Sequence, residues 1–183
     1  MALKSTVVRA ELQISDLDRH YYAAHPLTLA QHPSETDERL MVRLLAFAMF
    51  AEERLEFGRG LSQDDEPDLW LKQLTGEIEL WIDLGQPEES RIRKACGRAR
   101  RVVVVTYSGR SADLWWEKNG NALARSRNLT VIDVDPGTVT ALSTLMGRGM
   151  RLNVMIQDGE IQILGGDSTI EVRPRVRQAA APD

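Results

Sequence analysis

Residues 68–84 read Asp-Leu-Trp-Leu-Lys-Gln-Leu-Thr-Gly-Glu-Ile-Glu-Leu-Trp-Ile-Asp-Leu, and they predict the β-hairpin that decides the fold. The segments Asp68–Leu74 and Glu77–Leu84 alternate between polar and apolar residues, as half-buried strands do. Thr75-Gly76 between them predicts a two-residue turn. We therefore expect two antiparallel strands that are joined directly at Thr75-Gly76.

A two-residue turn determines which residues face one another across this hairpin. The predicted pairs are Leu74–Glu77, Lys72–Glu79, Trp70–Trp81 and Asp68–Asp83. One face is then apolar, and the other holds both tryptophans, Lys72 and four carboxylates. Asp68 opposite Asp83 requires neutralisation by a divalent cation, a shared proton, or a lysine or arginine. The alternative interpretation is a solvated face of an ordinary hairpin.

The surrounding elements predict an α/β protein with a mixed central sheet flanked by helices. On the N-terminal side we expect strands Leu3–Ile14 and Tyr21–Ala30, then a helix Glu35–Phe57 capped by Ser34. The later expected elements are Glu88–Arg98 (helix), Val102–Tyr107 (central strand), Ser111–Ala124 (helix), Leu129–Val134 (strand), Pro136 to about Met146 (helix) and a meander of Arg151–Gln157, Glu160–Leu164 and Thr169–Arg173. Residues 1–177 are expected to form a single domain, and residues 178–183 a disordered tail.

Composition and charge exclude several classes of protein. The net charge of −4 over 183 residues gives no overall basic field, so nucleic-acid binding requires a local basic patch. A single cysteine, Cys96, allows no internal disulfide, and the three histidines show no zinc-ligand spacing. No segment has the length of a signal peptide or a membrane span, which predicts a cytoplasmic protein.

Several stretches resemble the YaeQ family over most of the chain. They are His32–Arg39, Glu66-Pro67-Asp68, Gly76–Pro87, Arg91–Arg98 and Val102–Tyr107. The resemblance implies a variant PD-(D/E)XK (restriction endonuclease-like) core, with the N-terminal hairpin and the C-terminal β-meander as additions. The order helix, hairpin, helix and strand agrees with such a core.

The resemblance also implies a nuclease-like carboxylate site. The PD-(D/E)XK pattern has an aspartate at the start of one strand and an acid-X-lysine triplet on the next, often with a glutamate from the preceding helix. Transferred to this chain, it implies Asp68 and Asp83 as catalytic ligands of Mg²⁺ or Mn²⁺. Glu79 and the helix residue Glu38 are the further metal ligands that it implies.

The lysine of that pattern is missing from this chain. Gly85 lies two residues after Asp83, and Trp81 lies two residues after Glu79. A lysine in this role stabilises charge on the phosphate or orients the attacking water, so a substitute is needed for catalysis. Lys94 on the following helix and Lys72 are candidate substitutes, and Gln86 offers a neutral donor.

Two functions follow, and the sequence leaves open whether the protein is an enzyme. The first is Mg²⁺- or Mn²⁺-dependent hydrolysis of phosphodiesters in nucleic acid. The second is a non-catalytic module that binds nucleic acid or a protein of transcription or repair, which the missing triplet favours. Arg91, Lys94 and Arg98 share one helix face and predict phosphate contacts, unless that face is simply solvated. Cys96 has no histidine near it in sequence, which favours a structural thiol.

Overall fold

Three parallel strands form the centre of one sheet because their residues are apolar on both faces. They are β5 (Ile78–Leu84), β6 (Ala99–Thr106) and β7 (Leu129–Asp133) in the computed structural model, which describes residues 4–59 and 65–183. In β6 the run Val102–Val105 is at most 3% exposed. β-branched residues suit a strand covered on both faces, so the valine run confirms the predicted central strand.

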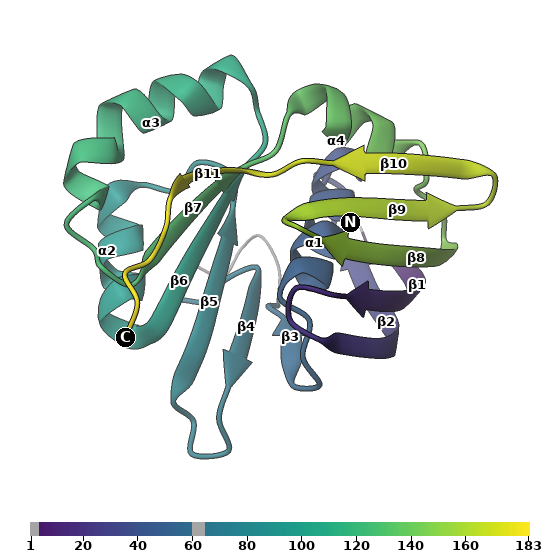
Figure 1. The fold of residues 1–183 in the computed structure, drawn as a ribbon, viewed down its shortest axis with the longest axis horizontal. Helices are drawn as coiled ribbons and strands as arrows, with labels where there is room; N and C mark the ends of the chain where they lie inside the picture. Colours follow the sequence, from purple (N-terminus) through teal and green to yellow (C-terminus); the bar gives the residue numbers. More distant parts are fainter. Residues whose placement is uncertain (1–3, 60–64) are drawn as a thin grey trace. The chain divides into compact units, whose positions relative to one another are not determined.

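The sheet has the order β11-β7-β6-β5-β4-β3, and its outer strands are antiparallel to their neighbours. These outer strands are β3 (Leu55–Phe57), β4 (Leu69–Lys72) and β11 (Arg175–Gln178). Helices α2 (Glu89–Arg98) and α3 (Arg110–Leu123) connect the parallel strands and cover one sheet face (Figure 1). Ile92, Ala95 and Leu123 of these helices pack there with Trp81 and Val104.

A second sheet has the order β10-β9-β8-β1-β2. Its elements, with the accompanying helices, are β1 (Thr6–Asp16), β2 (Tyr21–Gln31), β8 (Gly149–Gln157), β9 (Glu160–Gly165), β10 (Ser168–Val172), α1 (Asp37–Met49) and α4 (Pro136–Ser143). β1 pairs antiparallel with β2 and parallel with β8. The predicted N-terminal hairpin and C-terminal meander are therefore parts of one mixed sheet.

Contacts divide the chain into two units, each containing one of these sheets. The first unit comprises Met1–Met49 and Gly137–Pro174, and the second comprises Phe50–Pro136 and Arg175–Asp183. Within the described residues the structure is therefore a mixed α/β fold with two mixed sheets and four helices. The expectation of one central sheet missed this division, because the hairpin and the meander are joined only through the pairing of β1 with β8.

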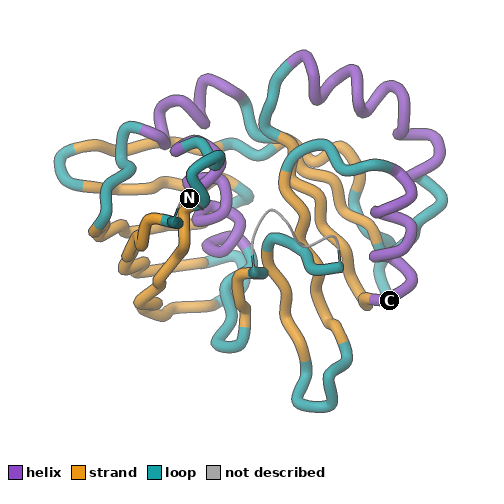
Figure 2. The backbone as a smooth tube through the Cα atoms, turned by 180° about the vertical axis from the view of Figure 1, so that it is seen from behind, coloured by secondary structure: helices purple, strands orange, loops and turns teal. Residues whose placement is uncertain are grey.

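The hairpin turn between β4 and β5 has three residues rather than two. The Gly76 N–H donates to the Gln73 carbonyl at 2.9 Å, and the Gln73 N–H donates to the Glu77 carbonyl at 2.8 Å. Gly76 has a φ of +89°, which completes a turn of type I with a glycine bulge. The predicted Leu74–Glu77 pair is therefore wrong, and Leu74 is 95% exposed. The turn between β4 and β5 is the loop at the bottom of the view in Figure 2.

A β-bulge at Glu79 restores the predicted register further from the turn. Leu71 pairs with Leu80 and Lys72 with Ile78, so the predicted Lys72–Glu79 pair is wrong. The predicted pair Trp70–Trp81 is confirmed. Because a bulge inverts the alternation of side chains, Ile78 packs with Trp81 in the core that faces the helices, and the predicted acidic face is interrupted at Glu79.

The helix expected over Glu35–Phe57 is shorter at both ends. It begins at Asp37, and Thr36 rather than Ser34 caps it, because the Arg39 N–H donates to the Thr36 hydroxyl at 3.1 Å. It ends at Met49, and the following residues include strand β3. An edge strand of three residues has too little periodicity for a sequence pattern to separate it from a helix end. Leu3, at the expected start of the first strand, lies outside the described residues.

The C-terminal segment is held against β7. β11 pairs with β7, and the Gln178 amide donates to the Leu123 and Ser126 carbonyls at 3.0 and 3.3 Å. Beyond β11 the Ala181 N–H donates to the Arg127 carbonyl at 2.7 Å. Gln178, Ala180 and Ala181 thus have hydrogen-bond partners, and the disorder expected for residues 178–183 stays a prediction. Across the described part of the chain, no helix combines the length and apolar character that crossing a membrane requires.

The turn geometry predicts opposite effects of alanine at two glycines with open space around them. Gly76→Ala should lower the free energy of unfolding by about 1–2 kcal/mol, because an L-residue resists the positive φ. Gly97→Ala in α2 should raise it by about 0.5–1 kcal/mol, because alanine is the better helix former. Urea unfolding followed by circular dichroism measures both changes; equal effects at the two positions would contradict the turn.

Candidate functional site

The candidate site lies where β5 ends and α2 begins. Asp83, the penultimate residue of β5, is 3% exposed. It follows Trp81 by two residues, so both side chains lie on the sheet face that α2 covers. Gly85 has a φ of +94° and turns the chain out of the strand, and α2 starts four residues later. The first turn of α2 therefore returns Arg91 to the end of β5.

Arg91 binds both oxygens of the Asp83 carboxylate. Its Nε donates to Oδ2 at 2.9 Å and its Nη2 to Oδ1 at 3.1 Å. Nη2 also donates to the Glu66 backbone carbonyl at 2.9 Å. Two parallel charge-assisted hydrogen bonds make this a strong and directional pair. The sequence left open whether a divalent cation, a shared proton, or a lysine or arginine neutralises Asp83. In the structure an arginine, Arg91, does so.

Asp68 and Glu66 lie in the segment before β4, beside this ion pair. Asp68 Oδ2 accepts the Leu84 N–H at 2.8 Å, which holds Asp68 at the end of β5 next to Asp83. Glu66 accepts the Arg59 N–H at 3.0 Å and the Arg59 Nε–H at 2.8 Å. The hydrogen bonds from Arg59, first the backbone one, lower the pKa of Glu66.

The other predicted site residues lie at separate places. The Gln86 amide donates to the Ser111 hydroxyl at 2.6 Å, and Glu79 accepts the Gln73 amide at 3.1 Å. Glu38 lies on α1 in the first unit, whereas Asp68, Asp83 and Glu79 lie in the second. In residues 4–59 and 65–183, no group of three or more His, Cys, Asp and Glu side chains is arranged to hold a metal ion.

Lys94 is exposed and makes no ion pair with any carboxylate that the structure describes. Within the described residues, its ammonium therefore forms no ion pair with Asp83, Glu79 or Asp68. The physical reason is that Arg91, one turn closer to the N-terminus of α2, already binds Asp83. The roles of Asp68, Asp83, Glu79, Glu38, Gln86 and Lys94 in metal binding or catalysis stay predictions.

A groove of about 860 Å³ runs along α2 next to the ion pair, and we call it the α2 groove. Trp81 lines it together with Ser90, Arg91, Lys94, Ala95 and Arg98 of α2, and Asp65 and Glu88 also contribute. The guanidinium carbons of Arg91 and Arg98 lie 5.7 and 5.1 Å from the centre of the Trp81 ring. The groove therefore combines cations with an aromatic side chain.

Trp81 is only 2% exposed, and its indole N–H has no hydrogen-bond acceptor among the described residues. A buried donor without a partner costs about 1–3 kcal/mol, so such groups are uncommon away from functional sites. Trp70 packs edge-on against Trp81 with ring centres 6.2 Å apart. Of the aromatic pair that the hairpin register predicts, Trp81 lines the groove, and Trp70 packs against it.

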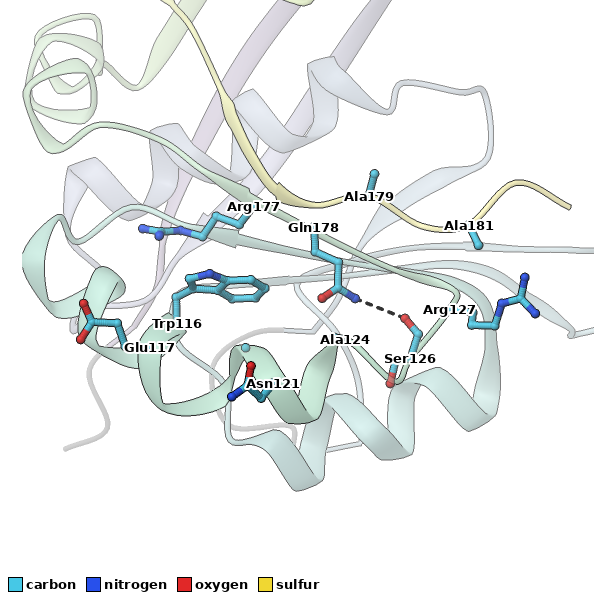
Figure 3. A pocket seen from close by; sticks show the side chains of 11 residues that line it. Trp116, Glu117, Asn121, Ala124, Ser126, Arg127, Arg177, Gln178, Ala179 and Ala181 are labelled. Atoms are coloured by element: carbon cyan, nitrogen blue, oxygen red, sulfur yellow. Dashed lines mark hydrogen bonds between the residues drawn. The ribbon is translucent and has the colours of Figure 1, made fainter.

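A second pocket, of about 630 Å³, lies between α3 and the C-terminal segment (Figure 3). Trp116 and Asn121 line it from α3, and Arg177 and Gln178 line it from β11. Gln178 is engaged with carbonyls of the α3 end, so this wall also anchors the chain terminus. Trp115 and Trp116 are both half-buried, and the indole N–H of Trp115 donates to the Pro87 carbonyl at 2.9 Å.

Sequence reasoning missed the charged network at the carboxyl end of β7. The Thr106 hydroxyl donates to Asp133 at 2.5 Å, and Arg175 and Arg177 lie 3.6 and 3.5 Å from the same carboxylate. Both arginines also contact Asp113, and the hydrogen bond from Arg177 lowers the pKa of Asp113. The alternation Arg175-Val-Arg177 is typical of an edge strand with both arginines on one face. It could have indicated that these two side chains bind the same carboxylate.

The single cysteine is partly buried on α2. Burial raises the pKa of the Cys96 thiol, and a hydrogen bond with Ser126 only partly offsets this. A raised pKa leaves less thiolate at neutral pH, which agrees with a structural thiol and not with a nucleophile.

The ion pair at the end of β5 predicts a large difference between two arginines of the same helix. Arg91→Ala should lower the free energy of unfolding by about 3 kcal/mol, because it leaves the buried Asp83 carboxylate unpaired. Arg93→Ala removes an exposed pair with Glu89 and should change it by less than about 0.5 kcal/mol. Urea denaturation at neutral pH measures both, and equal small losses would show that Arg91 does not stabilise Asp83.

Comparison with known proteins places this geometry in a family. The model of the YaeQ protein family matches residues 1–174. The chain is 44% identical to the YaeQ protein of Salmonella typhi over 173 residues, which is 94% of this chain and 96% of that protein. It is 45% identical to the YaeQ protein of Escherichia coli K12 over 172 residues, covering 94% and 95% of the two chains.

Two crystal structures have the same fold. The YaeQ protein from Xanthomonas axonopodis pv. citri is 62% identical with a TM-score of 0.93, covering 97% of this chain and 99% of that one. The YaeQ protein from Pseudomonas syringae is 35% identical with a TM-score of 0.91, covering 96% and 97% of the two chains. The family match, the sequence identity and the shared fold agree, and the chain belongs to the YaeQ family.

Proposed function

We propose that this protein is a non-catalytic relative of PD-(D/E)XK nucleases that binds nucleic acid without cleaving it. The observation that supports this most directly is the pair of hydrogen bonds from Arg91 to both Asp83 oxygens, at 2.9 and 3.1 Å. A hard divalent cation needs carboxylate oxygens as ligands. Here the Arg91 guanidinium already occupies both oxygens of Asp83 and neutralises its negative charge. The residues present therefore do not fit a bound Mg²⁺ or Mn²⁺ as they are arranged.

The absence of a lysine at the carboxylates supports the same function. Gly85 and Trp81 occupy the two positions where the nuclease pattern requires a lysine. One candidate substitute, Lys94, is exposed and forms no ion pair within the described chain. Without a cation aimed at the reacting phosphate, stabilisation of its transition state loses a main electrostatic contribution.

The choice of nucleic acid over a protein partner rests on the α2 groove. Arg91, Lys94 and Arg98 follow one another at spacings of three and four residues, which places them on one helix face. Cations next to an aromatic ring are the combination that single-stranded nucleic-acid sites use. Because the net charge is −4, we expect this local site to bind weakly and with a strong dependence on salt.

This function predicts binding without hydrolysis. Labelled single-stranded DNA and RNA incubated with the protein and millimolar Mn²⁺ should show complex formation by fluorescence anisotropy and no cleavage above background on gels. Calorimetric titration with Mn²⁺ should give no heat of binding. Asp83→Asn is the matched control for the two negative results, since it should change neither the absence of cleavage nor the absence of a heat of Mn²⁺ binding. A pull-down from lysate that retains its partner after nuclease treatment would instead favour a protein ligand.

Metal-dependent phosphodiester hydrolysis is the second candidate function, and one observation favours it. The Leu84 N–H to Asp68 hydrogen bond, at 2.8 Å, holds Asp68 beside Asp83, as two acids of a nuclease site require. Asp68 and Asp83 would be the metal ligands, with Glu79 completing the set, once Arg91 releases Asp83. Cleavage that appears with Mn²⁺ and disappears in Asp83→Asn would establish this function and refute the first.

A further inference from the structure

Two cations of the α2 groove, Lys94 and Arg98, lie outside the ion pairs of the described chain, although the carboxylates of Asp65 and Glu88 also line the groove. Arg91 is neutralised by Asp83, but neither Lys94 nor Arg98 forms an ion pair in the described residues. Arg98 donates a hydrogen bond to the Asp65 backbone carbonyl at 3.1 Å. Like charges four residues apart on a helix repel one another. An anion bound between Lys94 and Arg98 would remove this repulsion.

Trp81 adds an independent indication of a ligand in the same groove. Trp81 is only 2% exposed, yet its indole N–H lacks an acceptor in the described structure. The guanidinium carbon of Arg98 lies 5.1 Å from the centre of the Trp81 ring, and both side chains line the groove. A ligand oxygen with negative charge matches both the unpaired donor and the unpaired cations.

We propose that the α2 groove binds one phosphate group of single-stranded nucleic acid through Lys94, Arg98 and the indole N–H of Trp81. The volume of about 860 Å³ suits a group of nucleotide size rather than the flat contact of a duplex. This proposal rests on the proposed function and specifies where that function is performed. It also assigns Lys94 to ligand binding, and not to catalysis at the Asp83 carboxylate.

Asp65 and Glu88 limit the strength of this site. Both line the groove and oppose the attraction of a polyanion. With about two cations engaged, the logarithm of the binding constant should fall with the logarithm of salt concentration with a slope of about −1.4. The same acids favour ligands that present a phosphate at one defined position over any diffuse negative surface.

Fluorescence anisotropy with a labelled oligothymidylate about 12 nucleotides long tests the proposal on the full chain. The double variant Lys94→Ala/Arg98→Ala should weaken binding about tenfold or more and reduce the salt slope by about one to two. Trp81→Phe keeps a ring and removes the donor, so it should weaken binding about two- to tenfold. Arg93→Ala is the matched control: it removes a cation from the same helix outside the groove and should change affinity by less than about twofold.

Circular dichroism and urea unfolding of each variant separate loss of binding from loss of fold. Lys94 and Arg98 are exposed, so their variants should unfold as the native protein does. If the native protein binds the oligonucleotide and the double variant binds it equally well, the phosphate site is refuted while the proposed function stands. If the native protein fails to bind any single strand at low salt, the proposed function fails, and this site with it.

Discussion

The ion pair between Asp83 and Arg91 is the interaction on which the candidate site depends. Asp83 is 3% exposed, and a buried carboxylate is stable only with a partner that satisfies its charge and its lone pairs. Arg91 does both, and its contact with the Glu66 carbonyl also joins the segment before β4 to α2. One guanidinium therefore holds together three parts of the chain at the end of β5. In the function that we propose, this same ion pair is the reason why Asp83 does not bind a metal ion.

Helix α2, which contains Arg91, has one further face that packs in the core and another that lines the groove. Ile92 and Ala95 are buried against the sheet and make α2 a part of the core. Lys94 and Arg98, toward its C-terminus, line the groove and are suited to that end by the helix dipole. Because the packing of Ile92 fixes the rotation of α2, it also fixes where these cations lie relative to Trp81. The position of the binding site that we propose is thus a direct consequence of core packing.

The hairpin shows how local irregularities can compensate for each other. The three-residue turn at Gly76 shifts the register by one residue, and the bulge at Glu79 shifts it back. Trp70 and Trp81 consequently face one another as alternation predicts, although the pairs nearest the turn do not. Of the predicted acidic face, only the neighbouring positions of Asp68 and Asp83 persist, because they lie beyond the bulge.

By itself the sequence determined most of the elements, the valine-rich central strand and the pairing of Trp70 with Trp81. These features depend on local periodicity, turn residues and β-branched side chains, which neighbouring residues express directly. Only the tertiary structure decided the pairing of β1 with β8, whose residues, such as Arg9 and Gly149, are far apart in the chain. It also decided that Arg91, and not Lys94, neutralises Asp83. The helical wheel leaves both cations available, and the choice depends on how the turn at Gly85 aims α2 against the end of β5.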